Sequence, residues 1–387
     1  MSEWKRLLTK LVSNAEEQFD ELAARLRQRL SGSGTVKILP YLGYGTSTML
    51  NVRGRVLEDY GVAVEVDTDG TWHNLLNMYR RLNTNDVADA RVLVSFGNYA
   101  QEVTTNNLGF FEARLELDQP IHPPAFWQDL HVKLLSPTPS TGVDALARVL
   151  IPSSDAQFGI ISDLDDTVIQ TDVMNVLKMA QNTFLRNART RLPFAGVAEF
   201  YQALHRGTRG LNPIYYVSNS IWNLYDLFID FFELRNIPLG AFFLIDLGLN
   251  EDYFSNLKLG RHKSNTIETL LTTYPRLPFI LIGDSGEKDP ELYLKTVQQF
   301  PGRVPTIYIR DIAGSTRDEQ MRDIIAQAAA AGTEMLVVPD TVTAAEHAAA
   351  QGYIAHEALP HIRRGMLQDN RPYANSEPLV HLDLNEE

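Results

Sequence analysis

The chain contains no cysteine among its 387 residues, which excludes disulfides, zinc–thiolate sites and a thiol nucleophile. It also contains no apolar run of the roughly 20 residues that span a bilayer, so we expect no transmembrane segment. Basic residues are in the minority, and the formal net charge of −13 argues against a nucleic-acid partner. The beginning of the sequence lacks the apolar core of a signal peptide, which predicts a cytoplasmic protein.

A chain of 387 residues is too long for one ordinary hydrophobic core, so two or more domains are expected. Residues 1–34 are predicted to form an amphipathic helix and a Ser-Gly linker. The helix carries six basic and five acidic residues, so its polar face is nearly neutral. Trp4 would suit a membrane interface. Because the polar face is nearly neutral, we favour docking of the helix on the body of the protein.

Residues 35–152 have the short alternating segments and the frequent turn residues of an all-β sandwich domain. One helix is expected to interrupt the strands near His73–Leu82. The predicted strands are Val36–Leu39, Met49–Leu57, Val62–Val66, Ala90–Phe96, Phe110–Leu117, Leu130–Leu135 and Ala145–Leu150.

Residues 153–355 change to alternating strands and helices, which is the pattern of an α/β domain. A helix is predicted at Thr341–Gln351, and residues 356–387 are expected to form a polar C-terminal tail that is ordered only where it docks. Continuous apolar runs predict parallel strands at 158–163, 213–218, 242–245, 279–283 and 304–309, with a sixth at Met335–Val338.

The apolar run that begins at Phe158 ends in two carboxylates, Asp163 and Asp165. Side chains two positions apart on a strand point the same way, so these carboxylates should converge on one spot. Their mutual repulsion is costly without a cation or a shared proton. The pair therefore suggests a metal site and a reaction.

Other polar residues follow the second and fourth of these strands. Ser218 and Asn219 follow the second strand, Asp284 follows the fourth, and Asp289 comes five residues later. Lys263 is expected to start the helix that leads back to the fourth strand. Because the carboxyl ends of parallel strands meet at one edge of the sheet, we expect these residues to share one crevice.

These residue types fit phosphoryl transfer. Asp163 is our candidate nucleophile, which would form an aspartyl-phosphate, and Asp165 is our candidate general acid and base. Mg²⁺ prefers hard oxygen ligands, and we assign it to Asp163, Asp165 (through a nearby backbone carbonyl), Asp284 and Asp289. The candidate phosphate contacts are Thr167, Ser218, Asn219 and Lys263.

Two of these assignments have a competing interpretation at the level of single residues. Ser218 could be the N-cap of a helix, a role that can coexist with phosphate binding. The cation of the site could be His262 or Lys258 in place of Lys263, and Lys258 is the stronger of the two alternatives.

The residues beyond Asp284 also allow more than one role. Asp289 could bind the metal through water, orient Lys263, or cap a helix that begins at Pro290. Arg310 and Asp311 follow a predicted strand at the same edge, where they either bind a head group or form a salt bridge on the rim.

The order of these residues resembles the four motifs of the haloacid dehalogenase superfamily: Asp163-x-Asp165-x-Thr167, Ser218, Lys263 and Gly283-Asp284-x-x-x-x-Asp289. The wider segments are similar to the actin-patch-associated phosphatidate phosphatase family, with lipin-type phosphatases as more distant relatives. These segments are Asp163–Val168, Tyr216–Ser220, His262-Lys263 and Gly283–Tyr293. The resemblance covers about residues 155–355. It implies a Rossmann-like parallel sheet and Mg²⁺-dependent removal of phosphate from phosphatidate, at a membrane surface, to give diacylglycerol.

The spacing of the motifs leaves no room for a large cap domain. Asp163 and Ser218 are 55 positions apart, and Ser218 and Lys263 are 45 apart. Residues 172–193 could form only a small helical flap, so we expect an open site that suits a bulky or membrane-held substrate. Two other functions stay open: a phosphatase for a soluble phosphomonoester, and a catalytically silent lipid- or phosphate-binding module. The intact pair of Asp163 and Asp165 argues against the silent binding module, because such a module needs no proton shuttle.

Overall fold

The computed structural model describes seven stretches of the chain: residues 35–59, 86–121, 125–137, 142–164, 195–245, 256–312 and 318–369. Several predicted features lie outside these described residues. They are the N-terminal helix and linker (1–34), the strand Val62–Val66, the helix His73–Leu82, the flap 172–193, and the site residues Asp165 and Thr167.

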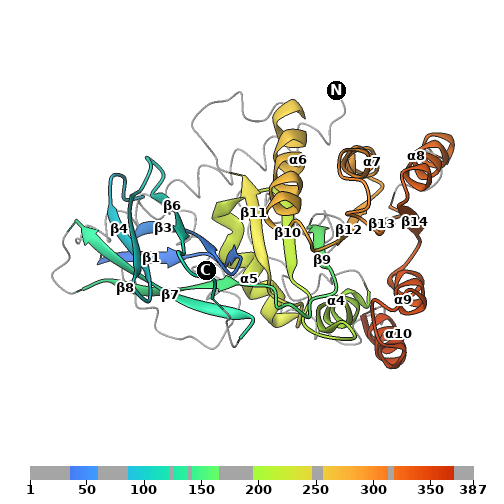
Figure 1. Cartoon of the computed structure of the whole chain (residues 1–387), viewed down its shortest axis with the longest axis horizontal. Helices are drawn as coiled ribbons and strands as arrows, with labels where there is room; N and C mark the ends of the chain where they lie inside the picture. The colour runs from blue at the N-terminus through green and yellow to red at the C-terminus, as the bar shows by residue number, and fades with distance from the viewer. Residues whose placement is uncertain are drawn as a thin grey trace, which may run out of the picture.

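The second half of the chain is built on a six-stranded parallel sheet, which confirms the predicted α/β class (Figure 1). Its strands lie in the order β11-β10-β9-β12-β13-β14. The central strands β9, β10 and β12 are buried along nearly their whole length, as their continuous apolar sequences require. The bounds are β9 Gly159–Asp163, β10 Ile214–Ile221, β11 Ala241–Ile245, β12 Phe279–Asp284, β13 Thr306–Arg310 and β14 Glu334–Val338.

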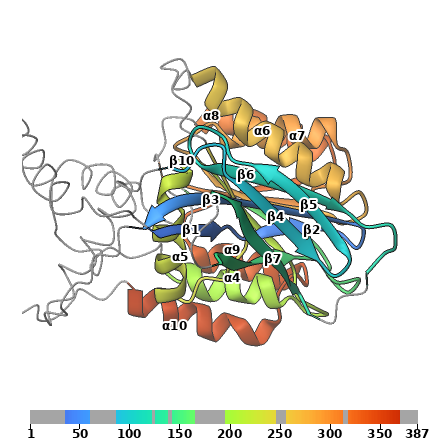
Figure 2. The same cartoon turned by 90° about the vertical axis from the view of Figure 1, so that its left-hand side faces the viewer.

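Helices cover both faces of this sheet (Figure 2). Ile160 and the side chains of α4, α5, α9 and α10 share one apolar cluster, whereas Ile161 packs with α6, α7 and α8 in another. The two faces separate because successive side chains of a strand point to opposite sides. The helices are α4 Val197–Arg206, α5 Tyr225–Leu234 (after the 3-10 turn η1 Trp222–Leu224), α6 Asn256–Thr273, α7 Asp289–Gln299, α8 Asp318–Ala330, α9 Thr341–Ala350 and α10 Leu359–Asp369 (after the 3-10 turn η3 His356–Ala358).

Two helix predictions need correction. Helix α6 begins at Asn256, so Lys263 lies inside the helix and not at its start. Residues 359–369 form the regular helix α10, in which the buried Ile362 packs against the core, although we predicted a tail there. The predicted helix at 341–351 matches α9 within one residue.

The eight described strands of the first half form one hydrogen-bonded sheet, mostly antiparallel, in the order β1-β3-β2-β8-β7-β4-β5, with β6 paired to β3. The sheet curls on itself: β5 contacts β6, and the Arg114 amide donates to Gln101 Oε1 at 2.8 Å. The strands β2 and β5 were not predicted. The bounds are β1 Thr35–Pro40, β2 Gly43–Gly45, β3 Met49–Asp59, β4 Arg91–Phe96, β5 Tyr99–Thr104, β6 Phe110–Glu116, β7 Trp127–Ser136 and β8 Asp144–Leu150.

The two halves meet in an aromatic junction directly after β10. The ring of Tyr41 stacks on Trp222 with a centroid distance of 4.6 Å, and the guanidinium of Arg53 lies 4.7 Å from the Trp222 ring. The Leu42 amide donates to the hydroxyl of Tyr225 at 2.8 Å. The curled sheet therefore packs against the segment that immediately follows Ser218 and Asn219.

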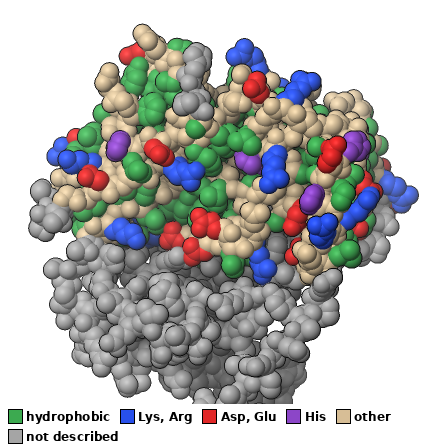
Figure 3. All heavy atoms as spheres, turned by 90° about the horizontal axis from the view of Figure 1, so that it is seen from below, with side chains coloured by type: hydrophobic (Ala, Val, Ile, Leu, Met, Phe, Trp, Pro, Cys, Tyr) green, Lys and Arg blue, Asp and Glu red, His purple; other side chains and the backbone are tan. Residues whose placement is uncertain are grey.

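The surface carries charges of both signs. On the face shown in Figure 3, basic and acidic side chains are interspersed with exposed apolar ones. None of the described helices is both long enough and apolar enough to cross a membrane.

Candidate active site

Three neighbouring strands bring acidic and hydroxyl side chains to one edge of the parallel sheet. Val217 on β10 pairs with Asp163 on β9, so Ser218 lies one residue further along the same edge. Ile282 on β12 pairs with Ser162, which places Asp284 beside the end of β9. The side chains of Asp163, Ser218 and Asp284 are buried. The three strands therefore bring these residues together at their carboxyl ends, as expected.

Lys263 reaches this edge from α6 and contacts three carboxylates. Its Nζ lies 2.8 Å from Asp163 Oδ1, 2.7 Å from Glu287 Oε2 and 3.0 Å from Asp289 Oδ1. Burial alone would lower the pKa of Lys263, but the surrounding carboxylates raise it well above its usual value. The ammonium group therefore stays charged at neutral pH, next to the candidate nucleophile.

The structure favours Lys263 over the alternative His262, whose Nε2 lies 3.2 Å from the carbonyl oxygen of Phe243 on β11. Its ring is thus turned toward the neighbouring strand. The side chain of Lys258 lies outside the described part of the chain.

Asp289 orients its neighbours and does not cap a helix. Helix α7 begins at Asp289 itself, and its N-cap residue, Lys288, makes no capping hydrogen bond with its side chain. Its Oδ1 accepts from Lys263 Nζ, and its Oδ2 accepts from the Asp284 amide at 3.3 Å. The close approach depends on Gly283, where an added Cβ would lie 2.4 Å from Asp289 Oδ2. Of the roles considered from the sequence, the structure therefore favours the orientation of Lys263.

The acidic residues at this edge fit a divalent cation. Asp163, Asp284 and Asp289 each offer one carboxylate oxygen, and these oxygens lie within 4.8 Å of one another. The Oδ1 of Asp284 accepts from the amides of Gly286 and Glu287 at 2.6 and 2.9 Å. Its Oδ2 is buried and has no hydrogen-bond partner among the described residues.

Burial and the adjacent Asp289 raise the pKa of Asp284 to about 7. A buried carboxylate oxygen without a donor is costly to ionise. A hard cation such as Mg²⁺ would offset that cost. Asp163 and Asp284 are the residues best placed to hold it, because both oxygens of Asp289 already accept hydrogen bonds.

Ser218 and Asn219 lie one and two residues beyond Val217, which pairs with Asp163 in the sheet. Ser218 is inside β10, and its Oγ accepts from the Ser220 amide at 2.8 Å. It is therefore not the N-cap of a helix. The Oδ1 of Asn219 is buried and has no hydrogen-bond partner within the described ranges.

The structure adds two polar contacts that the sequence analysis missed. Glu287 shares Lys263 with the two aspartates. The Tyr201 hydroxyl and Ser162 Oγ are hydrogen-bonded at 2.8 Å, and Ser162 Oγ also donates to the carbonyl oxygen of Asp163 at 2.6 Å. The sequence carries no signal for this second contact, because Tyr201 lies on the buried face of α4 among apolar residues.

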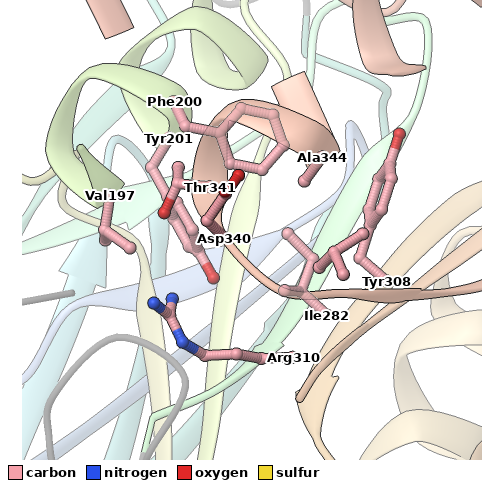
Figure 4. A pocket seen from close by; sticks show the side chains of 10 residues that line it. Val197, Phe200, Tyr201, Ile282, Tyr308, Arg310, Asp340, Thr341 and Ala344 are labelled. Atoms are coloured by element: carbon pink, nitrogen blue, oxygen red, sulfur yellow. The ribbon is translucent and has the colours of Figure 1, made fainter. Parts of the chain in front are cut away.

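Arg310 and Asp311 follow β13 at the same edge. Arg310 pairs in register with Asp284, and its side chain lines a pocket between the sheet, α4 and α9 (Figure 4). Asp311 is exposed, with its Oδ1 3.5 Å from Ser285 Oγ.

Comparison with known proteins finds a family of catalytic domains whose model matches the part of the chain that carries these residues. The family model that matches residues 158–311 is described as the catalytic domain of phosphatidate phosphatase APP1. This match confirms the predicted resemblance to the actin-patch-associated phosphatidate phosphatase family. The matched range contains each candidate site residue.

Two curated proteins are similar over the same part of the chain. Phosphatidate phosphatase APP1 of Saccharomyces cerevisiae is 34% identical over 168 residues, which are 43% of this chain and 28% of the yeast protein. An uncharacterized protein of Schizosaccharomyces pombe is 30% identical over 157 residues, or 40% of this chain and 25% of its own length. The chain thus matches about a quarter of the length of these relatives.

Among solved structures, a carbohydrate acetylesterase from Xanthomonas citri aligns with 85% of this chain and 74% of its own, at 13% identity. The TM-score of this alignment is 0.31.

Proposed function

We propose that this protein is a Mg²⁺-dependent phosphatase that hydrolyses phosphatidate to diacylglycerol and phosphate through an aspartyl-phosphate. The observation that carries the proposal is the position of the Lys263 ammonium, 2.8 Å from Asp163 and 3.0 Å from Asp289, with Asp284 beside them. The match to a phosphatidate phosphatase catalytic domain supports the substrate.

The reaction assigns a role to each of these side chains. A carboxylate oxygen of Asp163 attacks phosphorus, the ester P–O bond breaks, and Asp165 protonates the leaving glycerol oxygen. Asp165 then takes a proton from water, which attacks the phosphorus of the aspartyl-phosphate and regenerates Asp163. When bound, Mg²⁺ would neutralise part of the phosphate charge and of the repulsion between carboxylates.

The fixed charges around Asp163 do the remaining electrostatic work. Lys263 supplies a positive charge that Asp289 and Glu287 hold in place. Ser218, Asn219 and backbone amides can donate to the phosphoryl oxygens. We assign Thr167 to the same phosphate-binding group, as its position in the motif suggests.

We also propose that the parallel sheet is of the haloacid dehalogenase type without a large cap. The corresponding domain limits are 153–355 for the catalytic domain and 35–152 for the β-rich domain, which we expect to have sandwich architecture. We further propose that the protein is cytoplasmic and binds its lipid substrate peripherally at the membrane surface, where an open site would admit it.

The test is the release of inorganic phosphate from vesicles that contain phosphatidate, compared with a panel of soluble phosphate esters. We expect faster release from the vesicles, loss of activity in EDTA, and recovery with Mg²⁺. Preference for a soluble ester would favour the alternative phosphomonoesterase. No release from either substrate with Mg²⁺ present would favour a silent binding module.

The nucleophile is tested with Asp163→Asn, which is nearly isosteric and removes one of the repelling charges. This variant should fold normally and lose turnover. A residual kcat above about a hundredth of the wild-type value would show that Asp163 is not the nucleophile.

A further inference from the structure

A small pocket lies beside the candidate active site, on the face of the parallel sheet that α4 and α9 cover (Figure 4). Its walls are mainly apolar, with Phe200, Ile282 and Tyr308 among them. Its volume is about 30 Å³, which is room for roughly two or three heavy atoms. The pocket can therefore hold one small group, but not an extended chain.

The pocket contains a buried hydroxyl that makes no hydrogen bond to the described residues. Thr341, at the start of α9, is 4% exposed. Its Oγ1 is buried and has no hydrogen-bond partner in the part of the chain that the structure describes. The helix does not need this hydroxyl as a cap, because Asp340 Oδ1 accepts from the Thr343 amide at 2.8 Å. An unpaired buried hydroxyl is unfavourable, which indicates that Thr341 serves a ligand.

A positively charged side chain lines the same pocket. Arg310 lines it, and its side chain extends from β13 toward the hydroxyl of Tyr201 (Figure 4). The positive charge of Arg310 is close enough to oppose the rise that burial causes in the pKa of Tyr201. The guanidinium group can only donate hydrogen bonds, so together with Thr341 it favours a ligand atom that accepts them.

The polar end of the pocket is close to the nucleophile. The Tyr201 hydroxyl is 2.8 Å from Ser162 Oγ, which is 2.6 Å from the carbonyl oxygen of Asp163. Two hydrogen bonds thus connect the pocket with the backbone of Asp163. Arg310 also pairs in register with Asp284, so the pocket lies at the same edge of the sheet as the candidate active site.

We propose that this pocket binds the acyl ester carbonyl nearest to the phosphate of an acylated glycerol phosphate, with Thr341 and Arg310 as hydrogen-bond donors. The inference rests on the proposed function and specifies its substrate class. A carbonyl oxygen accepts and does not donate, the carbonyl carbon with its oxygen fits the volume, and the apolar walls suit the first methylene of the acyl chain. The rest of the chain stays outside, in the lipid surface.

The experiment compares phosphate release from diacyl phosphatidate and from its dialkyl ether analogue, which has no ester carbonyl. Both lipids are presented at the same surface fraction in otherwise identical detergent micelles. Wild-type protein should prefer the diacyl lipid by about tenfold in kcat/KM, as expected for one or two hydrogen bonds. Thr341→Val should reduce this preference by about three- to tenfold, and Arg310→Gln should reduce it as well.

Thr272→Val is the matched control, because it makes the same change at an exposed position of helix α6, which does not line the pocket. It should leave the ratio between the two lipids unchanged. Melting temperatures confirm that each variant is folded. If Thr341→Val does not fold, Thr341→Ala is measured in its place. Thr341→Ser retains the hydroxyl, so it should keep the wild-type ratio of kcat/KM between the two lipids.

The outcomes separate this inference from the proposed function. Equal wild-type rates on the two lipids would overturn the ester pocket and leave the phosphatase intact. A preference for the diacyl lipid that remains unchanged in Thr341→Val and Arg310→Gln would also overturn it, since another part of the protein would then recognise the ester. Failure to release phosphate from either lipid with Mg²⁺ present would overturn the proposed function and this inference together.

Discussion

Replacement of Gly283 by alanine tests whether Asp289 must approach the end of β12 as closely as it does. A Cβ at this position would lie 2.4 Å from Asp289 Oδ2, 2.9 Å from Asp289 Cβ and 2.9 Å from Tyr293 Cε2. Tyr293 cannot yield easily, because it is buried and its hydroxyl donates to the Ile282 carbonyl at 3.0 Å. Asp289 must therefore move, and its bonds to Lys263 and to the Asp284 amide must lengthen or break.

The size of the effect follows from this geometry. Overpacking a tight site costs about 1–3 kcal/mol, which corresponds to a fall in melting temperature of about 1–4 °C for a chain of 387 residues that melts as one unit. Displacement of Lys263 by about 1 Å should lower kcat by about a hundredfold. The loss of activity should thus be much larger than the loss of folded protein.

Thermal melts and phosphate release on the same preparations measure both quantities. Gly142→Ala is the control, since its Cβ would have no neighbour closer than Asp144 Oδ2 at 3.9 Å. A Gly283→Ala protein with kcat within threefold of wild type would refute the argument. It would mean that Asp289 is not needed to hold Lys263.

Three further predictions address the charges of the site and its support. Lys263→Met should lower kcat by about 10²- to 10³-fold, and it should destabilise the protein by about 3–5 kcal/mol because buried carboxylates lose their cation; an unchanged melting temperature would contradict this. Without metal, the raised pKa of Asp284, about 7 against an ordinary 3.8, gives a contribution to stability that is fully present below about pH 4 and is lost as the pH rises through about 7. Mg²⁺ should therefore raise the melting temperature more at pH 8 than at pH 6, and equal shifts at both pH values would argue against metal binding at Asp284. Trp222→Ala should lower the free energy of unfolding by about 3–5 kcal/mol and should also lower kcat, since Trp222 anchors the segment after Ser218. Trp222→Phe should keep most of the wild-type stability and kcat. A kcat that the alanine substitution does not change would show that the junction does not support the site.

The sequence predicted the parallel sheet well, because each strand is a continuous apolar run that fits a strand buried on both faces. It also predicted the meeting of Asp163, Ser218 and Asp284, since strand ends in such a sheet have a fixed common edge. These inferences needed only local patterns and one topological rule.

The elements that escaped prediction lack such patterns. In β5 the burial alternates between exposed and half-buried positions, so its sequence shows no apolar strand signal. The sequence from about Arg363 is polar and contains prolines, so it predicts a tail in place of helix α10. Its buried contact is made by Ile362 and by Gly365, where an added Cβ would lie 2.3 Å from Glu199 Oε2. Long-range contacts such as Tyr201 with Ser162 depend on packing between distant segments, which no window of sequence contains.

The aromatic junction has a consequence for how this protein can be divided. Tyr41 and Phe110 belong to the same apolar cluster as Ile160 in the parallel sheet, and the Tyr274 hydroxyl donates to the Gly45 carbonyl at 3.0 Å. A fragment cut near residue 152 would therefore expose large aromatic rings to water. We expect the described halves to melt in a single cooperative transition, and the phosphatase-like half to aggregate when it is expressed by itself.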